Sequence, residues 1–188
     1  MNKVIFGSQL LMYPTPTILV GANVDGKPNF MAVAWGGIVN SEPPMISVSI
    51  RHHRYTYLGI KQNMTFSANI ASIEMVKEAD YCGIVSGSSI DKSDKCHFTI
   101  FYGKVGTAPL IEQCPVNIEC KVIHLLDLGT HALVIGQIMQ THVSEDCLTD
   151  GKPDISKIKP IIADIPAHNY YSHGDMIGKA FSIGKEIK

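Results

Sequence analysis

The sequence has no large excess of charge of either sign. Its 188 residues include 16 Lys and Arg against 17 Asp and Glu, so the formal net charge is −1 with neutral histidines. A surface that coats nucleic acid is basic and clustered, so this balance argues against a nucleic-acid-binding protein. No run approaches 18 consecutive apolar residues, and the first residues lack a long apolar stretch followed by a small-residue cleavage site. We therefore expect a soluble cytoplasmic protein with neither a nucleic-acid nor a membrane partner.

Cysteine and histidine patterns typical of cross-links or metals are also missing. The five cysteines include no C-x-x-C pair, and the eight histidines form no H-E-x-x-H motif. We expect no disulfide framework and no zinc site, and interpret the cysteines as small, reduced hydrophobic residues. Asp91, Asp94 and His97 match no metal-ligand spacing and are interpreted as loop polarity. No metal is expected.

The dominant periodicity is two residues, which indicates strands. Extended runs are predicted at 17–24, 29–35, 45–50, 64–70, 116–126 and 132–143. Asp25-Gly26 predicts a hairpin between the first two runs, and Pro28 is assigned to that turn because proline cannot donate to a strand ladder.

Helices are predicted to be few and short. One is expected at 54–63, and a second from an N-cap at Ser72 to a stop at Gly83. Residues 87–95 are polar and rich in Gly, Ser and Asp, so they are predicted to form a loop. Because the chain lacks strand–helix alternation and any G-x-G-x-x-G motif, we expect a single domain over 1–188. Its fold is predicted to be a closed or nearly closed β-barrel with small helices.

Two arginines and several hydroxyl groups lie where a predicted strand meets a predicted helix, between Ser49 and Thr56. Unpaired N–H groups at a helix start and the guanidinium groups of Arg51 and Arg54 all favour an anion, and a phosphate ester is the natural guest. A solvated basic turn is the alternative interpretation of this segment.

Three further residues are candidates for a ligand site. Trp35, the only tryptophan, precedes Gly36-Gly37 and could form a flat aromatic wall, or it could lie in the core. Lys92 could stabilise a developing anion or form an exposed salt bridge. Residues 127–131 are a further hairpin candidate, between the last two extended runs, and His131 could bond a ligand carbonyl or cap this hairpin turn.

Seven short motifs occur in a consistent order between residues 10 and 185. They include P-x-P-x-x-L-V, G-K-P-N-x-M-x-x-A-W-G-G, P-P-x-x-x-V-S-I-R, D-Y-C-G-x-x-S-G, D-K, P-V-x-x-E-C and G-x-H. They lie at Pro14–Val20, Gly26–Gly37, Pro43–Arg51, Asp80–Gly87, Asp91-Lys92, Pro115–Cys120 and Gly129–His131. This ordered set resembles the flavoredoxins and the wider flavin reductase-like family of FMN-binding split-barrel proteins.

The resemblance implies a mainly β fold, a six-stranded antiparallel split β-barrel with short peripheral helices. It also implies a homodimer with one FMN per subunit near the interface. The residues implied beside the isoalloxazine ring are Asn29, Met31, Ala34 and Trp35. The segment implied to hold the ribityl phosphate includes Ser49, Arg51, Arg54, Thr56 and the backbone of Ile50. Near the polar edge of the ring, the resemblance implies Asp91-Lys92 and His131, with Asn69 in a neighbouring strand. Around position 164 it implies an aromatic side chain, where this chain has Asp164.

These residues together predict an FMN-binding oxidoreductase. Electrons would come from NAD(P)H or a reduced partner protein and pass through FMN to a flavin or another acceptor. The protein needs no nucleophile, because the cofactor supplies the redox chemistry. Reduction of the flavin at N5 builds negative charge at N1–C2=O, which a Lys92 or His131 donor would stabilise. A second hypothesis is a non-catalytic flavin-binding or ligand-sensing barrel. A third is a barrel that handles pyridoxal phosphate or haem, with His131 as an axial ligand.

Overall fold

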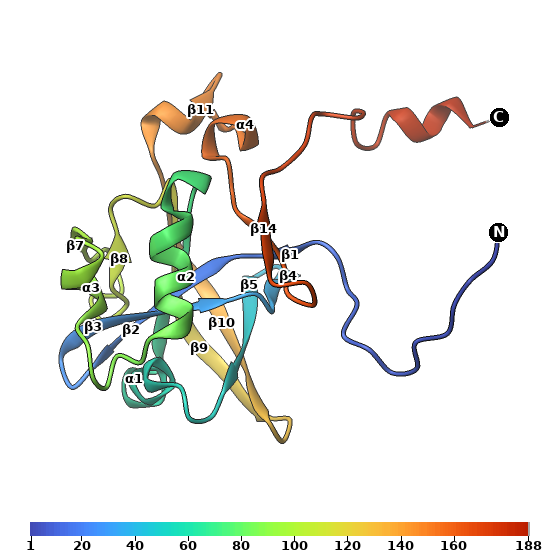
Figure 1. The fold of residues 1–188 in the computed structure, drawn as a ribbon. Coiled ribbons are helices and arrows are strands. Elements are labelled where there is room, and N and C mark those ends of the chain that lie inside the picture. The colour runs from blue at the N-terminus through green and yellow to red at the C-terminus, as the bar shows by residue number, and fades with distance from the viewer. Residues whose placement is uncertain (188) are drawn as a thin grey trace.

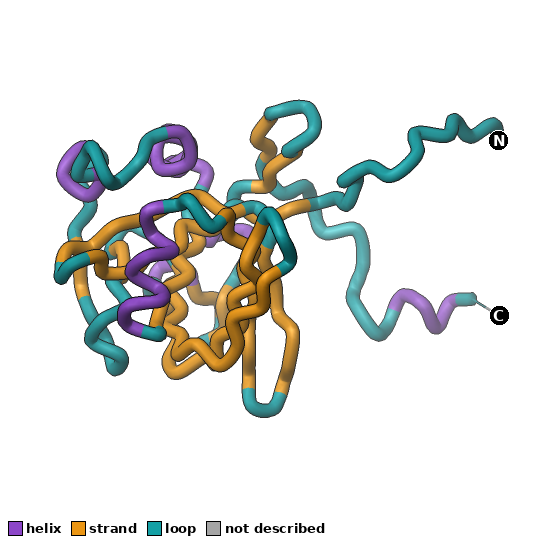
Figure 2. The backbone as a smooth tube through the Cα atoms, turned by 90° about the horizontal axis from the view of Figure 1, so that it is seen from below, coloured by secondary structure: helices purple, strands orange, loops and turns teal. Residues whose placement is uncertain are grey.

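The computed structural model describes residues 1–187 and contains one main antiparallel sheet of seven strands in the order β3-β2-β6-β9-β10-β5-β4. These strands are β2 (Ile18–Val24), β3 (Lys27–Val33), β4 (Gly36–Ser41), β5 (Pro44–Arg51), β6 (Thr65–Ile70), β9 (Val116–Asp127) and β10 (His131–Val143). The sheet curls around a central core, as the view in Figure 2 shows. The predicted mainly β split barrel is confirmed.

The prediction of six strands in this barrel is wrong by one. The extended runs predicted from the sequence leave residues 36–44 out, but Gly36-Gly37 begin β4, which runs to Ser41. β4 pairs antiparallel with β5, with Gly36 opposite Val48 and Ser41 opposite Pro44. Its five residues from Gly37 onward are all exposed, so the strand lacks the apolar alternation by which the others were predicted.

The smaller elements surround the barrel (Figure 1). The short strands are β1 (Thr15–Pro16), β7 (Ile100–Phe101), β8 (Leu110–Ile111), β11 (Leu148–Thr149), β12 (Lys152–Pro153), β13 (Ile162–Asp164) and β14 (Asn169–Tyr171). The helices are α1 (Tyr55–Asn63), α2 (Val76–Ile84), α3 (Lys92–Lys95) and α4 (Ile155–Ile158), with 3₁₀ turns at Ile73–Met75, Glu145–Cys147 and Ile183–Glu186. Across residues 1–187, every helix is too short or too polar to cross a lipid bilayer.

Three local predictions need correction. Pro28 lies in β3, where it pairs with Asn23, and an edge strand tolerates its missing N–H. Ser72 precedes a 3₁₀ turn and makes no side-chain cap, and Gly83 lies inside α2, which ends at Ile84. The polar segment 87–95 is not wholly a loop, because its last four residues form α3.

The core is divided between the two faces of the sheet. Successive residues of β2 belong to different clusters: Val20 packs inside the barrel with Phe66 and Val134, whereas Leu19 packs with Phe30 and Ala79 beneath α2. Because alternate side chains of a strand point to opposite faces, both faces of β2 are buried. This explains why β2 reads as a continuous apolar run.

The sheet does not close between its two edge strands, β3 and β4. These strands are consecutive in the sequence and are joined by only Ala34 and Trp35. The backbone N–H of Ser49 in β5 donates to the carbonyl oxygen of Trp35 at 2.8 Å, which fixes this connection against the barrel. The seam is our name for the opening between β3 and the opposite margin of the sheet, formed by β4 and β5, with its connection at Ala34-Trp35.

Both ends of the chain extend away from the barrel on the same side (Figure 1). Residues 1–12 contain no helix or strand and are all exposed. Many of the exposed side chains are apolar: Ile5 is 94% exposed in the first segment, and Ile177 and Phe181 are 96% and 99% exposed in the last.

Candidate functional site

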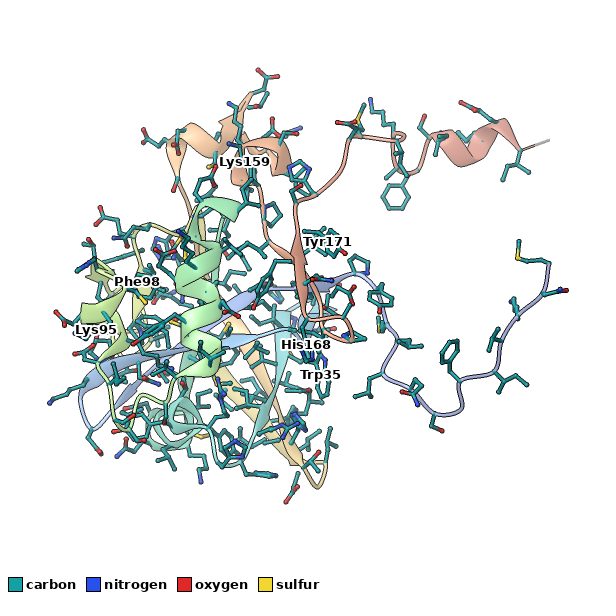
Figure 3. The ribbon with its side chains drawn as sticks, in the orientation of Figure 1. Trp35, Lys95, Phe98, Lys159, His168 and Tyr171 are labelled. Carbon is teal, nitrogen blue, oxygen red and sulfur yellow. The ribbon has the colours of Figure 1, made fainter. Side chains whose placement is uncertain are left out.

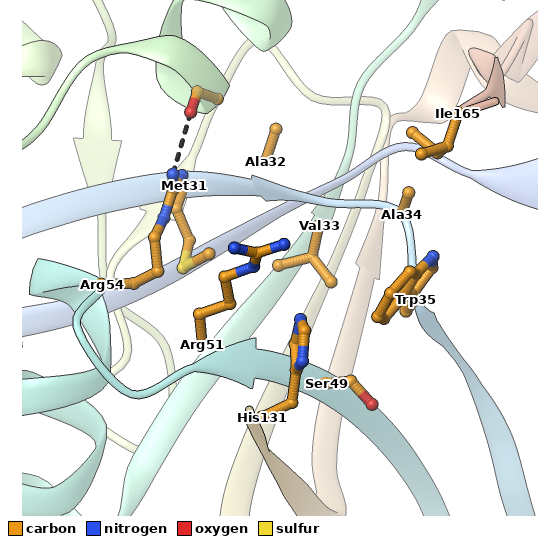
Figure 4. Close-up of a pocket in the computed structure, with 11 residues that line it drawn as sticks. Met31, Ala32, Val33, Ala34, Trp35, Ser49, Arg51, Arg54, His131 and Ile165 are labelled. Carbon is orange, nitrogen blue, oxygen red and sulfur yellow. Dashed lines mark hydrogen bonds between the residues drawn. The ribbon is translucent and has the colours of Figure 1, made fainter. Parts of the chain in front are cut away.

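The seam contains a hollow of about 220 Å³. Its walls come from the end of β3 and the following connection (Met31 to Trp35), from Ser49 and Arg51 of β5, from Arg54 before α1, and from His131 at the start of β10. Figure 4 shows these side chains converging on one space. We call this hollow the Trp35 pocket.

The aromatic wall of the Trp35 pocket is made of two rings. Trp35 and His131 have ring centroids 4.9 Å apart at an interplanar angle of 38°. The register of β10 on β5 places His131 opposite Arg51. Burial, followed by the positive charge of Arg51, lowers the pKa of His131, so the imidazole is neutral at pH 7. Its Nδ1 lies 2.9 Å from the hydroxyl of Thr130. A neutral His131 can therefore donate or accept a hydrogen bond toward a guest.

The chain has only two arginines, Arg51 and Arg54, and both line the Trp35 pocket. Arg51 is exposed at the end of β5, whereas Arg54 is half-buried at the N-cap position of α1. Arg54 Nη1 donates to the carbonyl oxygen of Gly83 at 3.0 Å, the bond drawn in Figure 4. Burial lowers the pKa of Arg54, but an arginine remains charged in proteins.

A second hollow of about 170 Å³, the Lys92 pocket, adjoins the first and shares Met31 and Arg54 with it. Its other walls include His53, Thr56 and Lys92, together with the chain that follows α2. The N-terminus of α1 faces this region and has no acidic residue in its first turn. The free N–H groups of a first helical turn favour a negative charge.

Lys92 is the first residue of α3 and is only 3% exposed. Its Nζ donates to the carbonyl oxygens of Val85 at 3.0 Å and Cys82 at 3.2 Å. Burial lowers the pKa of Lys92 to about 8. The exposed salt bridge considered from the sequence is therefore wrong. Asp91 has a supporting role, since its carboxylate accepts hydrogen bonds from the N–H groups of Ser93 and Asp94 and so caps α3.

Asn29 and Thr56 are buried next to each other, and Thr56 also lines the Lys92 pocket. Asn29 Nδ2 donates to Thr56 Oγ1 at 2.7 Å. A Cβ on Gly87 would lie 1.8 Å from Asn29 Oδ1, so any larger residue would force the amide or the loop to shift. Asn29, Gly87 and Asp91 line a third hollow of about 290 Å³, which shares Tyr55 and Gly87 with the Lys92 pocket. We call it the Asn29 pocket.

The three pockets follow β3 from Lys27 to Val33 and form one elongated groove. Within residues 1–187, the ion pairs between side chains are His52–Asp127, His142–Glu119 and Lys159–Glu74. Thus Arg51, Arg54 and Lys92 have no carboxylate partner in the described structure. A groove with three unpaired cations and an aromatic wall suits an elongated anion with a flat ring.

Most of the predicted site residues line this groove, but two do not. The groove brings together Asn29, Met31, Ala34, Trp35, Ser49, Arg51, Arg54, Thr56, Asp91, Lys92 and His131. Asn69 is fully buried elsewhere: its amide donates to Leu19 O and accepts from the backbone N–H of Ile111. The side chain of Ile50 is also fully buried and packs in the barrel core.

The sequence reasoning missed several residues of the groove. Ile165 lines the Trp35 pocket, next to the Asp164 at which the family resemblance implied an aromatic side chain. Gly83 contributes the carbonyl that holds Arg54. Neither carries a sequence signal, because a lone isoleucine and a backbone carbonyl are common everywhere. Tyr55 and Gly87 lie in or beside predicted segments, and their contacts across the fold cannot be read from local patterns.

No metal centre accompanies the groove in the part of the chain that the structure describes, where no three His, Cys, Asp or Glu side chains are grouped to hold an ion. The cysteines of residues 1–187 are all free thiols. Burial raises the pKa of Cys82 to about 12, so its thiol stays protonated at neutral pH.

Residues 10–155 match the family model described as flavin reductase like domain. The flavoredoxin of Methanosarcina acetivorans is 40% identical, covers 100% of both chains and superposes with a TM-score of 0.95. The flavoredoxin of Desulfovibrio vulgaris (Miyazaki F) is 42% identical, with 97% of this chain and 100% of that chain covered and a TM-score of 0.92. An uncharacterized protein of Archaeoglobus fulgidus is 35% identical over 146 residues, which are 77% of this chain and 81% of that protein.

These matches extend over the barrel and over both sides of the groove, and they agree with the family to which the sequence motifs pointed. This chain belongs to the flavin reductase-like family.

Proposed function

We propose that this chain is an FMN-binding oxidoreductase of flavoredoxin or flavin reductase type. It passes electrons between NAD(P)H, or a reduced partner protein, and an acceptor by way of FMN. The observation that carries the proposal is the set of three cations without carboxylate partners, Arg51, Arg54 and Lys92, in a groove that also has the aromatic wall of Trp35. The similarity to two flavoredoxins over essentially their whole length supports the same conclusion.

The residues present fit FMN in charge and shape. FMN combines a phosphate dianion with a flat apolar ring whose pyrimidine edge carries donors and acceptors. We assign the phosphate to Ser49, Arg51, Arg54 and Thr56, because guanidinium and hydroxyl groups bind phosphate oxygens well. Asn29, Met31, Ala34 and Trp35 face the ring, and Lys92 and His131 its polar edge. Asp91 acts through Lys92, by capping the helix that carries it.

When bound, FMN supplies the electron-transfer chemistry, and the protein supplies binding, orientation and electrostatics. The ammonium of Lys92 and a donor N–H of neutral His131 would stabilise the negative charge that develops at the N1–C2=O side of the ring on reduction. Buried Met31 and half-buried Trp35 exclude water from the ring. The groove offers no activated nucleophile, and this chemistry requires none.

The exposed apolar ends of the chain support a homodimer. Apolar side chains such as Ile5, Ile177 and Phe181 are almost fully exposed, and contiguous exposed apolar surface marks interaction sites. β4 is an edge strand that also exposes Ile38 and Val39. We therefore propose that the terminal segments pack on a second copy, with FMN near the interface.

The visible spectrum of the purified protein tests the proposed function. We expect a yellow protein, or a colourless one that gains the flavin absorbance with added FMN. We also expect NADH, NADPH or a reduced carrier protein to bleach that absorbance, and an acceptor to restore it. A protein that does not acquire colour with FMN would refute flavin binding. A stably yellow protein that neither nucleotide nor any reduced carrier bleaches would instead support the non-catalytic, ligand-sensing alternative.

A further inference from the structure

A second and larger hollow, of about 570 Å³, lies on the other side of Trp35. We call it the arm groove, because one wall is the N-terminal segment Gln9–Met12 and the opposite wall is the seam at Trp35 and β5. Figure 3 shows Trp35 near the β13–β14 hairpin, where the N-terminal segment leaves the barrel. Its volume lies in the range of roughly 300–1,000 Å³ that is typical of small-molecule sites.

The arm groove meets the Trp35 pocket. Four residues, including Ala34, Trp35 and Ser49, line both hollows. A molecule in the arm groove would therefore lie beside any ring held in the Trp35 pocket. Hydride transfer requires such contact, because the reacting atoms must come within about 3–3.5 Å.

The two hollows differ sharply in charge. The Trp35 pocket is lined by Arg51, Arg54 and His131, whereas no Lys, Arg, His, Asp or Glu lines the arm groove. The arm wall is formed by Leu10, Leu11 and Met12. An anion would lose its hydration in such a groove without gaining a cationic partner. The pyrophosphate of a dinucleotide is consequently a poor occupant.

The polar groups of the arm groove are mainly hydroxyls. Ser47 and Ser49 lie two residues apart on β5, so their side chains share one face of the strand. Both are half-buried, and neither hydroxyl is hydrogen-bonded to another residue of the described chain 1–187. Ser49 is assigned to the FMN phosphate, so the hydroxyl of Ser47 is the one available as a donor to a carbonyl oxygen of a guest.

From these observations we propose that the arm groove binds a neutral, flat, carbonyl-bearing organic molecule of the quinone type as the electron acceptor. This proposal rests on the proposed function, which places the flavin in the adjoining pocket. Reduction of a quinone to its hydroquinone takes up two electrons and two protons. A reduced flavin that is anionic at N1 would supply the two electrons and one proton as a hydride from N5, and the second proton would come from water. The electrons originate from the donor of the flavin, NAD(P)H or a reduced partner.

The probe is menadione, a neutral 1,4-naphthoquinone, and its charged counterpart is 1,4-naphthoquinone-2-sulfonate. Binding to the apoprotein and to the FMN-loaded protein is measured by calorimetry. Quenching of Trp35, the only tryptophan, is measured in the apoprotein, with free tryptophan amide correcting for absorbance. We expect menadione to bind both forms, to quench Trp35 and to bind more tightly than the sulfonate.

Two matched variants test the position of the site. Leu11→Asp puts a carboxylate in the arm wall, and we expect it to weaken menadione binding about tenfold, as the loss of an apolar contact and an added charge predict. Ile155→Asp introduces the same charge at a side chain of α4 that is 58% exposed and outside the groove, and should leave binding unchanged. FMN binding should be unaffected in both variants.

Four results would overturn the proposal: equal binding of both naphthoquinones, no effect of Leu11→Asp, displacement of menadione by FMN, or menadione binding only under conditions where the chain is monomeric. The last would mean that a second copy fills the groove. Failure of the proposed function is distinguishable, because then FMN does not bind while menadione still quenches Trp35 and responds to Leu11→Asp.

Discussion

Arg51 extends from the end of β5 into the Trp35 pocket without a carboxylate partner, so its charge is available to a guest. If it holds the phosphate, Arg51→Ala should weaken FMN binding by about 1.5–3 kcal/mol, the scale of a hydrogen bond to a charged group. Binding of riboflavin, which lacks the phosphate, should not change. Titration of the apoprotein with both flavins measures the two dissociation constants.

Lys61→Ala is the matched control for Arg51→Ala. It removes one exposed positive charge from the last turn of α1, and Lys61 lines none of the groove pockets. FMN affinity should stay at the wild-type level. An equal loss in both variants would show that only net charge matters, and an equal loss for riboflavin would move Arg51 from the phosphate to the ring.

Lys92 should give FMN binding a dependence on pH. Because its pKa is lowered to about 8 by burial, the unliganded protein loses this charge as pH rises through 8. An anionic guest favours the charged form, so binding takes up a proton above pH 8 and FMN affinity falls as pH increases. The second ionisation of the phosphate occurs near pH 6, so above pH 7 it adds no further pH dependence to FMN affinity. Affinity measured by flavin fluorescence between pH 7 and 9.5 tests this.

In Lys92→Met, affinity should be lower at pH 7 and flat across that range, and the bound flavin should be harder to reduce. Lys95→Met, at the exposed other end of the same helix, should behave as wild type. A wild-type pH profile that survives in Lys92→Met would assign the titration to another group.

For single residues, the sequence predicted which side chains belong to the site better than it predicted their burial and their hydrogen-bond partners. Arg51, Arg54 and Trp35 were predicted from type and spacing, and the structure brings them into one pocket. The burial of Lys92 could not be predicted, because it depends on carbonyl groups of Cys82 and Val85 that α2 brings alongside. Asn69 has an ordinary structural role, and its position in a strand gave no indication that Leu19 and Ile111 would satisfy its amide.

Helix α3 consists of four residues and depends on its cap. Asp91 accepts from two backbone N–H groups, and loss of such a cap costs about 1 kcal/mol. Asp91→Ala should therefore weaken FMN binding, although Asp91 carries a negative charge whose removal would otherwise favour an anion. Asp154→Ala removes the cap of α4, which is also four residues long, and should leave FMN binding intact. Unfolding and FMN titrations on both variants make the comparison, and tighter binding by Asp91→Ala would show that its charge outweighs its cap.

The strand and loop that meet at Asn29 tolerate no extra atom. In Gly87→Ala, the new Cβ would collide with Asn29 Oδ1, whose amide is buried and bonded to Thr56. We expect weaker FMN binding and a lower melting temperature. Gly37→Ala in β4 is the control, since nothing lies within 4 Å of its Cβ position. Wild-type FMN binding in Gly87→Ala would show that the loop moves freely and that Asn29 does not help to form the site.

Among the elements, the strands with regular alternation or a continuous apolar run were predicted closely, and the elements with neither pattern were not. β9 and β10 appear as two long extended runs joined by a short turn, as expected. β4 was missed because all but its first residue are exposed, and α3 because four residues carry too little periodicity. The order of the strands in the sheet depends on long-range pairing, which local patterns do not encode.

For the whole molecule, the terminal segments predict self-association. We expect the native chain to sediment as a dimer and the double variant Ile177→Asp, Phe181→Asp to sediment as a monomer, because both side chains are almost fully exposed in one copy and would be buried on a second. Ile155→Asp, which changes a 58% exposed residue of α4, is the control and should remain dimeric. A monomeric native protein would contradict the proposed homodimer.

The two-residue connection between β3 and β4 limits how this scaffold can be altered. Ala34 and Trp35 tie both margins of the sheet together, and Trp35 is itself fastened to Ser49. A longer connection would shift the register of β4 on β5 and would not enlarge the entrance to the Trp35 pocket. The size of the entrance to the Trp35 pocket is therefore set by the side chains at a few positions. Replacing one of them with a smaller residue, for example at Val33, should admit a larger chromophore, whereas inserting residues in the connection should not.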